Sequence, residues 1–553
     1  MSATTSLSSA ASSAQAAAIA AITATMLSEP PPPGEVVNLI DPPSQRVKHS
    51  SISHLFGSYC SIRWLAFLRI FGTTKKFRYA VYFGFAADIA IYMYIIFSIL
   101  RAAYNVTLHP LAKFRGPRLR AAFYFPELLS LARGTAVEEI KDLHDRYGDI
   151  VRVTPEALSF DTAQSWRVSR IHSDIYGLRD GRREVGRDEK WHLDHAGKSN
   201  IIVVNATDHS RMRRTLAHAF SDVALREQES LMTTYFEQLI EKLQEKIDGS
   251  AASYIDLRDW YNFFTFDIIG DLCLGEAFGT SKSGSYHYWI EQILVGLKFV
   301  VVIRFAQAYP LFRIILALLM NLIPGVEKQK QGHMAYTIDK LEARLRKNTD
   351  RKDFISYILG NNKNGMSRDE IEGTATVMII AGSETTASAL CGATYYMLKH
   401  PKVLLAATSE VRKKFKTVND INMVSVRDLT YINTIIEEAL RMYPPTPSTL
   451  PRRTRSEGEI INGTFIPGNI SVGVNHWAAY HAAKNFADPD TFDPARWSTP
   501  PPDKYKHDDK TAFQPFSIGP RNCLGKNLPY FEMRSILARM LWNFDIELCK
   551  ESR

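Results

Sequence analysis

The chain has 553 residues, 45% of them hydrophobic, which suffices for a large buried core and is typical of a globular protein. The formal net charge of +9 is modest for this length, and no dense run of Lys and Arg interleaved with aromatic residues occurs, so we expect no nucleic-acid partner. The five cysteines are odd in number, widely spaced and without a CxxC pair, which argues against a structural zinc site or a disulfide-rich secreted fold.

The N-terminal region is low in complexity. Residues 1–34 consist mainly of Ala, Ser and Thr and end in a run of four prolines, a composition that buries too little apolar surface to fold. We expect a disordered extension over 1–45 and a juxtamembrane segment over 46–78. Within the latter, the apolar stretch Trp64–Phe71 is too short to cross a bilayer and is expected to lie at its surface.

A membrane-spanning helix is predicted over residues 79–100. This stretch of 22 residues contains one charged side chain, Asp88, and at 1.5 Å per residue it spans about 33 Å, enough for a bilayer core. Basic residues flank both ends, so the charge distribution does not set an orientation. The alternative is a buried core helix, which Asp88 would suit better.

Residues 104–553 are predicted to form one mainly α-helical domain with a small β-sheet. Helical periodicity dominates, and strand signals are confined to 148–160 and 459–474, where Asn462-Gly463 is typical of a hairpin turn. An apolar stretch over 288–322 contains Pro310, and we expect two buried or membrane-dipping helices joined there. A second membrane span is the alternative.

The segment FSIGPRNCLG, residues 516–525, carries the most specific signal for function. A cysteine thiolate at Cys523 can bind haem iron, and the loop glycines Gly519 and Gly525 permit a tight turn and a close backbone approach. Phe516 can shield the sulfur, while the planar Arg521 guanidinium suits a haem propionate. A buried structural cysteine and a catalytic nucleophile are the alternatives.

A long helix is predicted over 368–399, entered through the capping box Ser367-x-x-Glu370. Its middle reads AGSETT, residues 381–386. Small residues let a helix pass close to a flat cofactor, and the acid and hydroxyl of Glu384 and Thr385 can deliver protons to bound oxygen. In isolation, the same residues would be interpreted as an exposed helix face.

Together these segments resemble the cytochrome P450 superfamily. FSIGPRNCLG is similar to its haem-binding signature and AGSETT to its oxygen-activating helix, and HPLAKFRGP, residues 109–117, looks like the segment that follows the anchor in fungal microsomal members. The resemblance implies a cytochrome P450 fold behind an N-terminal membrane anchor, with Cys523 as ligand of haem b (heme b) iron. Arg115 stands where a proline is more usual in that segment.

The resemblance also implies roles for residues outside the two main motifs. His209 and Arg213 match positions that bind a propionate, although His209 replaces the usual tryptophan, and Arg452 matches a further propionate ligand. Glu438, Arg441 and Arg496 match a buried network that retains the cofactor. Without the resemblance, these residues would be interpreted as solvated charges and a surface ion pair.

The activity implied is insertion of one oxygen atom from O2 into a lipophilic small molecule, in fungal terpenoid or polyketide metabolism. Electrons would come from NADPH through a cytochrome P450 reductase, and the protein would be a single-pass protein of the endoplasmic reticulum with a cytosolic catalytic domain. Desaturation, epoxidation or rearrangement by the same cofactor, a non-catalytic haem binder and a membrane transporter are the alternatives.

Overall fold

The computed structural model describes residues 75–166, 175–177, 184–190, 199–249, 254–322, 326–347, 351–362, 365–448 and 450–552. The predicted extension 1–45 and residues 46–74 of the juxtamembrane segment lie outside them. The chain divides into two compact units, Met1–Ala112 and Lys113–Arg553.

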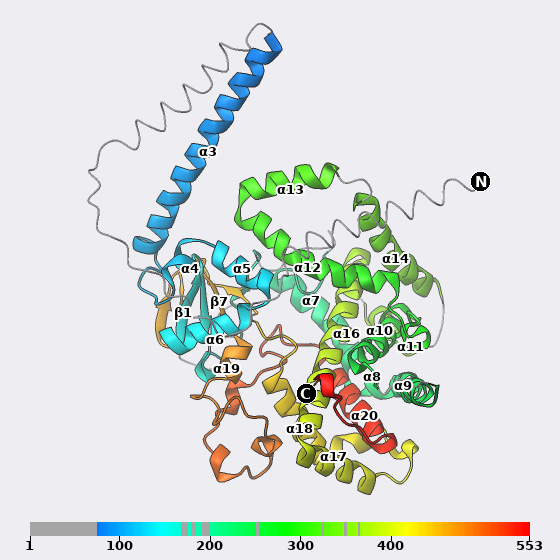
Figure 1. Cartoon of the computed structure of the whole chain (residues 1–553). Helices are drawn as coiled ribbons and strands as arrows, with labels where there is room; N and C mark the ends of the chain where they lie inside the picture. Colours follow the sequence, from blue (N-terminus) through cyan, green and yellow to red (C-terminus); the bar gives the residue numbers. More distant parts are fainter. Residues whose placement is uncertain are drawn as a thin grey trace, which may run out of the picture. The chain divides into compact units, whose positions relative to one another are not determined.

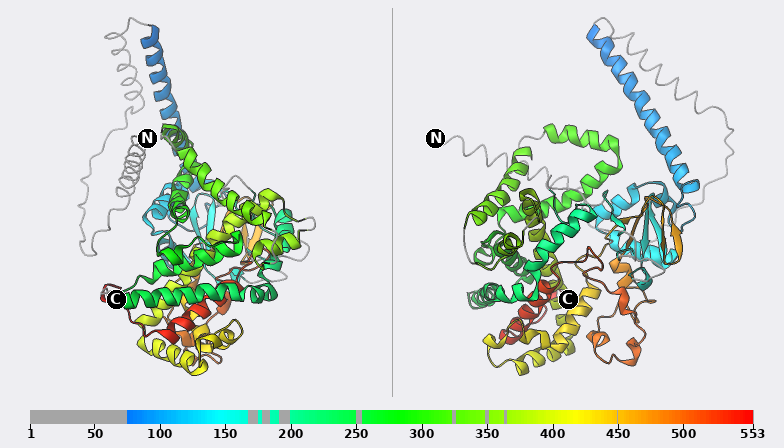
Figure 2. Two further views of the ribbon diagram at one scale, coloured as in Figure 1. Left: turned by 90° about the vertical axis from the view of Figure 1, so that its right-hand side faces the viewer. Right: turned by 180° about the vertical axis from the view of Figure 1, so that it is seen from behind.

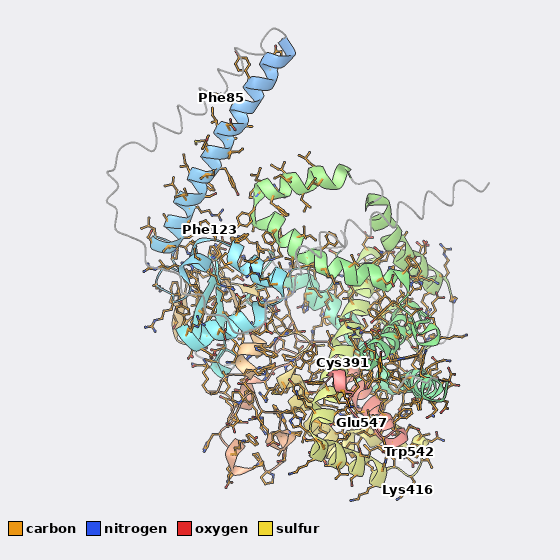
Figure 3. All side chains as sticks on the ribbon, viewed as in Figure 1. Phe85, Phe123, Cys391, Lys416, Trp542 and Glu547 are labelled. Carbon is orange, nitrogen blue, oxygen red and sulfur yellow. The ribbon has the colours of Figure 1, made fainter. Side chains whose placement is uncertain are left out.

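The first unit contains helix α3, Lys75–Thr107, which is longer at both ends than the predicted span. Within it, Gly84–Thr107 is long and apolar enough to cross a membrane, with a mean hydropathy of 1.6, and none of its most apolar 18-residue stretch is buried. Phe85, which Figure 3 labels on this helix, is 41% exposed. The absence of burial contradicts the core-helix alternative. In the part of the chain that the structure describes, α3 is the one helix with these properties.

The second unit is mainly helical and has a small β-rich part (Figure 1). The helices are α4 (Arg118–Ala122), α5 (Phe125–Arg133), α6 (Ala136–Tyr147), α7 (Ala206–Ala217), α8 (Asp222–Glu227), α9 (Glu229–Gly249), α10 (Leu257–Leu274), α11 (Thr280–Ser283), α12 (Tyr288–Ala308), α13 (Pro310–Leu322), α14 (Val326–Arg346), α15 (Phe354–Gly360), α16 (Arg368–Lys399), α17 (Pro401–Lys414), α18 (Thr430–Met442), α19 (His476–Tyr480) and α20 (Asn527–Asn543). The predicted mainly α-helical class is confirmed.

The larger sheet has the order β1-β2-β7-β4-β3, and its strands come from three distant parts of the chain. They are β1 (Ile150–Thr154), β2 (Ala157–Phe160), β3 (Gly186–Arg187), β4 (Arg452–Arg453) and β7 (Ser471–Val474). β2 and β7 are parallel, and the other pairs are antiparallel. Through the β3–β4 pair, the sheet therefore places the segment around residue 187 beside the segment around residue 452.

A separate hairpin pairs β5 (Glu459–Ile461) with β6 (Thr464–Ile466). Its turn residues Asn462 and Gly463 have φ of 49° and 71°, the left-handed conformation that a two-residue hairpin turn requires. The predicted turn is confirmed.

Helix α16 forms the centre of the helical part and packs against α10, α18 and α20 (Figure 2). The predicted capping box is present: the Ser367 side chain accepts from the backbone of Glu370, and the Glu370 carboxylate accepts from the backbone of Ser367. A Cβ on Gly382 would lie 2.8 Å from Ile269 of α10, so glycine is what allows this close helix contact.

The apolar stretch after residue 288 forms α12 and α13, with Pro310 as the first residue of α13. The predicted break is confirmed. Large side chains of α13 are exposed, among them Leu318 at 60% and Ile314 at 56%. The buried alternative is therefore wrong for α13, while a membrane-dipping helix stays a prediction.

Candidate functional site

The loop before α20 holds Cys523 through its own backbone. The Cys523 N–H donates to the Phe516 carbonyl at 2.9 Å, and the Asn522 N–H donates to the Gly519 carbonyl at 3.1 Å. Gly519 has φ of 77°, and a Cβ there would lie 2.0 Å from the Tyr176 carbonyl oxygen. Only glycine fits this turn, as the sequence predicted for a tight loop.

The Cys523 side chain lies at an exposed position, so a ligand can reach its sulfur. Burial by the surrounding protein nevertheless raises the pKa of the thiol, opposed by a hydrogen bond from the Gly525 backbone and by the charges of Arg213 and Lys526. The exposed surface suits the sulfur to a role as a metal ligand, which must be accessible. A reachable sulfur with an N–H donor and two nearby cations can become a thiolate once a metal binds it.

His209, Arg213, Arg452 and Arg521, which we call the basic cluster, interact electrostatically although they come from three regions of the chain. His209 is buried, and burial, followed by the charges of Arg521, Arg213 and Arg452, lowers its pKa to about 4. At neutral pH His209 is therefore an uncharged hydrogen-bonding group. The three arginines carry the positive charge of the cluster.

The α7 helix positions the first two members of this cluster. It begins at Ala206, earlier than the predicted start, and its N-terminus is capped by the Asn205 side chain, which accepts from the Asp208 N–H. His209 and Arg213 are one helical turn apart, and Arg213 reaches the carbonyl of Asn522 at 2.7 Å. The helix is thereby joined to the loop that carries Cys523.

On α16, the Thr385 hydroxyl donates to the Ala381 carbonyl at 2.6 Å, which fixes the side chain against its own helix. The Oε2 atom of Glu384 is buried and has no hydrogen-bond partner in the described part of the chain. Burial raises the pKa of Glu384, opposed by the charge of Arg258. A carboxyl group in this state holds its proton more tightly than one in water, as a proton donor must.

Glu438 and Arg441 of α18 form a fully buried ion pair at 2.8 Å, and Arg496 adds a bond to Glu438 at 3.3 Å. Two partners were missed by sequence reasoning: the Trp497 indole donates to Glu438 at 2.9 Å, and Arg496 binds Asp508 at 2.5 Å. Trp497 directly follows the predicted network residue Arg496, whereas Asp508 carries no local signal. The surface-pair alternative for these charges is wrong.

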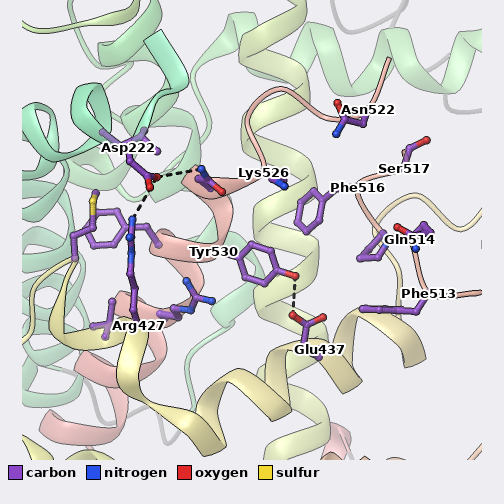
Figure 4. A pocket seen from close by; sticks show the side chains of 17 residues that line it. Asp222, Arg427, Glu437, Phe513, Gln514, Phe516, Ser517, Asn522, Lys526 and Tyr530 are labelled. Carbon is purple, nitrogen blue, oxygen red and sulfur yellow. Dashed lines mark hydrogen bonds and ion pairs between the residues drawn. The ribbon is translucent and has the colours of Figure 1, made fainter. Parts of the chain in front are cut away.

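A cavity of about 530 Å³ lies on one side of the Cys523 loop (Figure 4). Phe516 lines it beside Tyr530, with ring centroids 5.2 Å apart, and Tyr530 donates to Glu437 at 2.8 Å. Neither Cys523 nor any member of the basic cluster lines this cavity. It is therefore a feature of the loop's outer face.

The arrangement fits a haem held by Cys523. The sulfur is reachable, its loop supplies an N–H donor, and the charge of Arg213 acts on it. Arg213 also shares the basic cluster with Arg452 and Arg521. A buried guanidinium nitrogen without a partner, Nη1 of Arg187, adds a donor that lacks an acceptor within the described residues. Arg452, Arg521 and Arg213 can bind the propionates, and Cys523 the iron.

Comparison with known proteins agrees with this geometry. The family model for cytochrome P450 matches residues 117–553. The chain is 40% identical to cytochrome P450 monooxygenase astA of Talaromyces wortmannii, over 86% of this chain and 93% of that protein. It is 39% identical to cytochrome P450 monooxygenase aclL of Aspergillus oryzae, over 84% and 93%. With the cysteine loop, these matches show that the chain belongs to the cytochrome P450 family of haem-thiolate monooxygenases.

Proposed function

We propose that this protein inserts one oxygen atom from O2 into a C–H bond of a lipophilic small molecule in fungal secondary metabolism, of the terpenoid or polyketide type. The observation that carries the proposal is the loop of Cys523, whose sulfur is accessible, accepts a backbone hydrogen bond from Gly525 and lies near Arg213. When bound, haem supplies the redox chemistry that activates O2. The named relatives are fungal monooxygenases, which supports the same class of reaction here.

Proton delivery is assigned to α16. Burial raises the pKa of Glu384, so this carboxyl holds its proton more tightly than one in water. Thr385 presents a hydroxyl whose own hydrogen is engaged by the Ala381 carbonyl. The Thr385 oxygen therefore retains lone pairs that can accept a hydrogen bond from a water molecule or from an acid. We assign Glu384 as the acid and Thr385 as the group that orients the proton's path.

The lipophilic substrate is supported by the exposed apolar surface of α12 and α13. Val295, Phe299 and Ile303 recur every four residues on α12 and are 41%, 40% and 37% exposed. Such a stripe suits a membrane surface or an apolar ligand. With α3 as a membrane anchor, a substrate dissolved in the bilayer would be accessible to the enzyme.

The reductase that delivers electrons from NADPH is proposed to dock on the face of the Cys523 loop that contains the cavity. Lys526 is exposed there, as a steering charge must be. Arg534 also lines this face, but it is held by Asn433 at 2.6 Å and by the Tyr530 ring, so Lys526 is the better candidate. We place the protein in the endoplasmic reticulum with a cytosolic catalytic domain.

The test is a reconstitution of the full chain with a fungal cytochrome P450 reductase and NADPH, fed with lipophilic metabolites of the source organism under isotopically labelled O2. The proposal expects a product that carries one labelled oxygen atom. Desaturation would give a product without the label, and epoxidation or rearrangement would be distinguished by the product structure. Haem binding without NADPH-dependent product from any metabolite would support a non-catalytic haem protein instead.

A further inference from the structure

Tyr530 of α20 lies between the Cys523 loop and the cavity on its outer face. The Tyr530 ring packs against that of Phe516, with centroids 5.2 Å apart, and the Phe516 carbonyl accepts the Cys523 N–H at 2.9 Å. Figure 4 shows the Tyr530 hydroxyl pointing toward Glu437 at the edge of the cavity. Phe516 therefore connects the Tyr530 ring to the backbone that holds Cys523.

The Tyr530 hydroxyl has a base as its direct partner. It donates to Glu437 Oε1 at 2.8 Å, and burial, followed by the charge of Glu437, raises the pKa of Tyr530. Burial also raises the pKa of Glu437, opposed by the hydrogen bond from Tyr530 and by the charge of Arg534. The phenol therefore keeps its proton at rest, and a carboxylate with increased affinity for protons lies within transfer distance of it.

A cation lies over the Tyr530 ring. The Arg534 guanidinium is 4.9 Å from the ring centroid, in a half-buried site. The electrons of an aromatic face attract a cation, so a ring that lost an electron and kept its proton would repel it. Transfer of the phenol proton to Glu437 leaves a neutral ring instead. The surroundings of Tyr530 thus favour removal of one electron and one proton together.

The cavity gives a small molecule access to this side chain. Its volume of about 530 Å³ is within the range of small-molecule sites. Among the described residues that line it, three are cationic, Arg427, Lys526 and Arg534, and two are acidic, Asp222 and Glu437. Both acidic side chains already accept hydrogen bonds from neighbours in the cavity wall. The excess of positive charge suits a small anion.

We propose that Tyr530 is a one-electron donor to an oxidised haem, and that the cavity admits a small anionic reductant, of the class of ascorbate, that restores it. The inference rests on the proposed function, since oxidising equivalents reach the haem when peroxide is consumed there without a substrate. Tyr530 gives its electron to the haem and its phenol proton to Glu437, which leaves a neutral tyrosyl radical. The reductant then supplies one electron, and the proton returns from Glu437. Two such cycles supply the two electrons that one peroxide accepts.

The test uses the purified full chain with haem bound and no substrate present. Hydrogen peroxide is added, samples are frozen at successive times, and the electron paramagnetic resonance signal of a tyrosyl radical is recorded. The wild type gives this signal, and Tyr530→Phe, which keeps the ring but lacks the hydroxyl, loses it. Glu437→Gln keeps a hydrogen-bond acceptor but not the base, so the signal forms about a hundredfold more slowly, the lower end of what a positioned base contributes.

Tyr235→Phe is the matched control. Tyr235 also donates to a carboxylate, that of Asp271 at 2.8 Å, but it joins α9 to α10 rather than contacting the Cys523 loop. This variant keeps the wild-type signal. Ascorbate abolishes the signal of the wild type and of Tyr235→Phe and slows the bleaching of their haem by peroxide, whereas the haem of Tyr530→Phe gains no such protection.

A tyrosyl signal of wild-type intensity in Tyr530→Phe, or no such signal from a wild-type chain that holds haem, would overturn the inference. Equal protection by ascorbate in the wild type and in Tyr530→Phe would overturn the role of the cavity. If neither variant at the Tyr530–Glu437 pair binds haem, a radical trap added to the wild type decides: peptide mapping finds the adduct on Tyr530 if the inference holds and elsewhere if it fails. A wild-type chain that binds no haem would instead defeat the proposed function.

Discussion

Both η nitrogens of Arg213 donate to one residue, Asn522: Nη1 to its backbone carbonyl at 2.7 Å and Nη2 to its side-chain oxygen at 2.5 Å. Asn522 directly precedes Cys523. The α7 helix therefore holds the loop of Cys523 in place through these two hydrogen bonds. Arg213 also stabilises a negative charge on the Cys523 sulfur. Arg213, which the sequence predicted as a propionate ligand, therefore also stabilises the Cys523 thiolate.

For Arg213→Gln we expect faster loss of haem and partial loss of thiolate ligation, because the loop loses a charge-assisted bond that contributes about 1.5–3 kcal/mol. The ferrous–carbonyl spectrum measures thiolate ligation, and haem transfer to apomyoglobin measures retention. Arg214→Gln, at the exposed neighbouring position, is the matched control. If both variants lose haem at the same rate and keep the same ferrous–carbonyl spectrum, the hydrogen bonds from Arg213 to Asn522 have no role in holding Cys523 on the iron.

For Thr385→Ala we expect retained haem and a larger share of reduced O2 released as peroxide, because the hydroxyl beside Glu384 is lost. The ratio of peroxide formed to NADPH consumed measures this. Ser383→Ala is the control, since Ser383 is fully buried and its hydroxyl also bonds a carbonyl of its own helix, at 2.7 Å to Ile379. Peroxide release in Thr385→Ala no higher than in Ser383→Ala would argue against the proton path.

For Glu438→Ala we expect poorly folded protein with little haem. Removal of Glu438 leaves Arg441 and Arg496 buried without their shared carboxylate, an effect of about 3–5 kcal/mol. The comparison is Arg346→Ala, which breaks an exposed ion pair with Glu342 that contributes about 0–1 kcal/mol. Normal haem content and an unchanged unfolding transition in Glu438→Ala would contradict the stabilising role of the network.

The stability of the protein is expected to fall as pH decreases from about 6.5 toward 4, partly because of His476. This buried ring bonds the Thr446 carbonyl at 2.8 Å, and burial lowers its pKa to about 4, so the folded state keeps it neutral while the unfolded chain binds a proton. At pH 5 the group alone contributes about 2 kcal/mol to this loss. The stabilisation is complete above the unfolded pKa and disappears as pH falls through the folded one.

His476→Phe tests this, because phenylalanine keeps the ring contact with Trp166 but cannot titrate. The variant is expected to be less stable at pH 7.5, through loss of the bond to the Thr446 carbonyl, and to lose less stability between pH 6.5 and 5. Denaturant unfolding at each pH measures both effects. A wild-type slope in His476→Phe would refute the assignment.

Local signals predicted those parts of the fold that local interactions determine. The capping box fixed the start of α16 at Arg368, and Asn462-Gly463 predicted the β5–β6 turn, because both depend on a few adjacent residues. Helix α3 exceeds the predicted span because hydropathy measures where the apolar residues end, whereas the helix continues through polar residues to Thr107.

Long-range pairing was beyond sequence reasoning. The strands β3 and β4 have two residues each, too short for a periodic pattern, so the alignment of Arg187 with Arg452 has no local signature. The partnership of Asp508 with Arg496 likewise depends on how the chain between them folds back. The motif residues themselves were identified because their spacing within each segment is characteristic of the family.

The central claim is that the Cys523 sulfur binds haem iron, and the ferrous–carbonyl spectrum of the purified full chain tests it most directly. The account predicts a thiolate-shifted Soret band in the wild type and in Cys391→Ser, whose cysteine lies on α16 (Figure 3). In Cys523→Ser that band, or the haem itself, should be lost. A thiolate-shifted band that persists in Cys523→Ser would contradict the account.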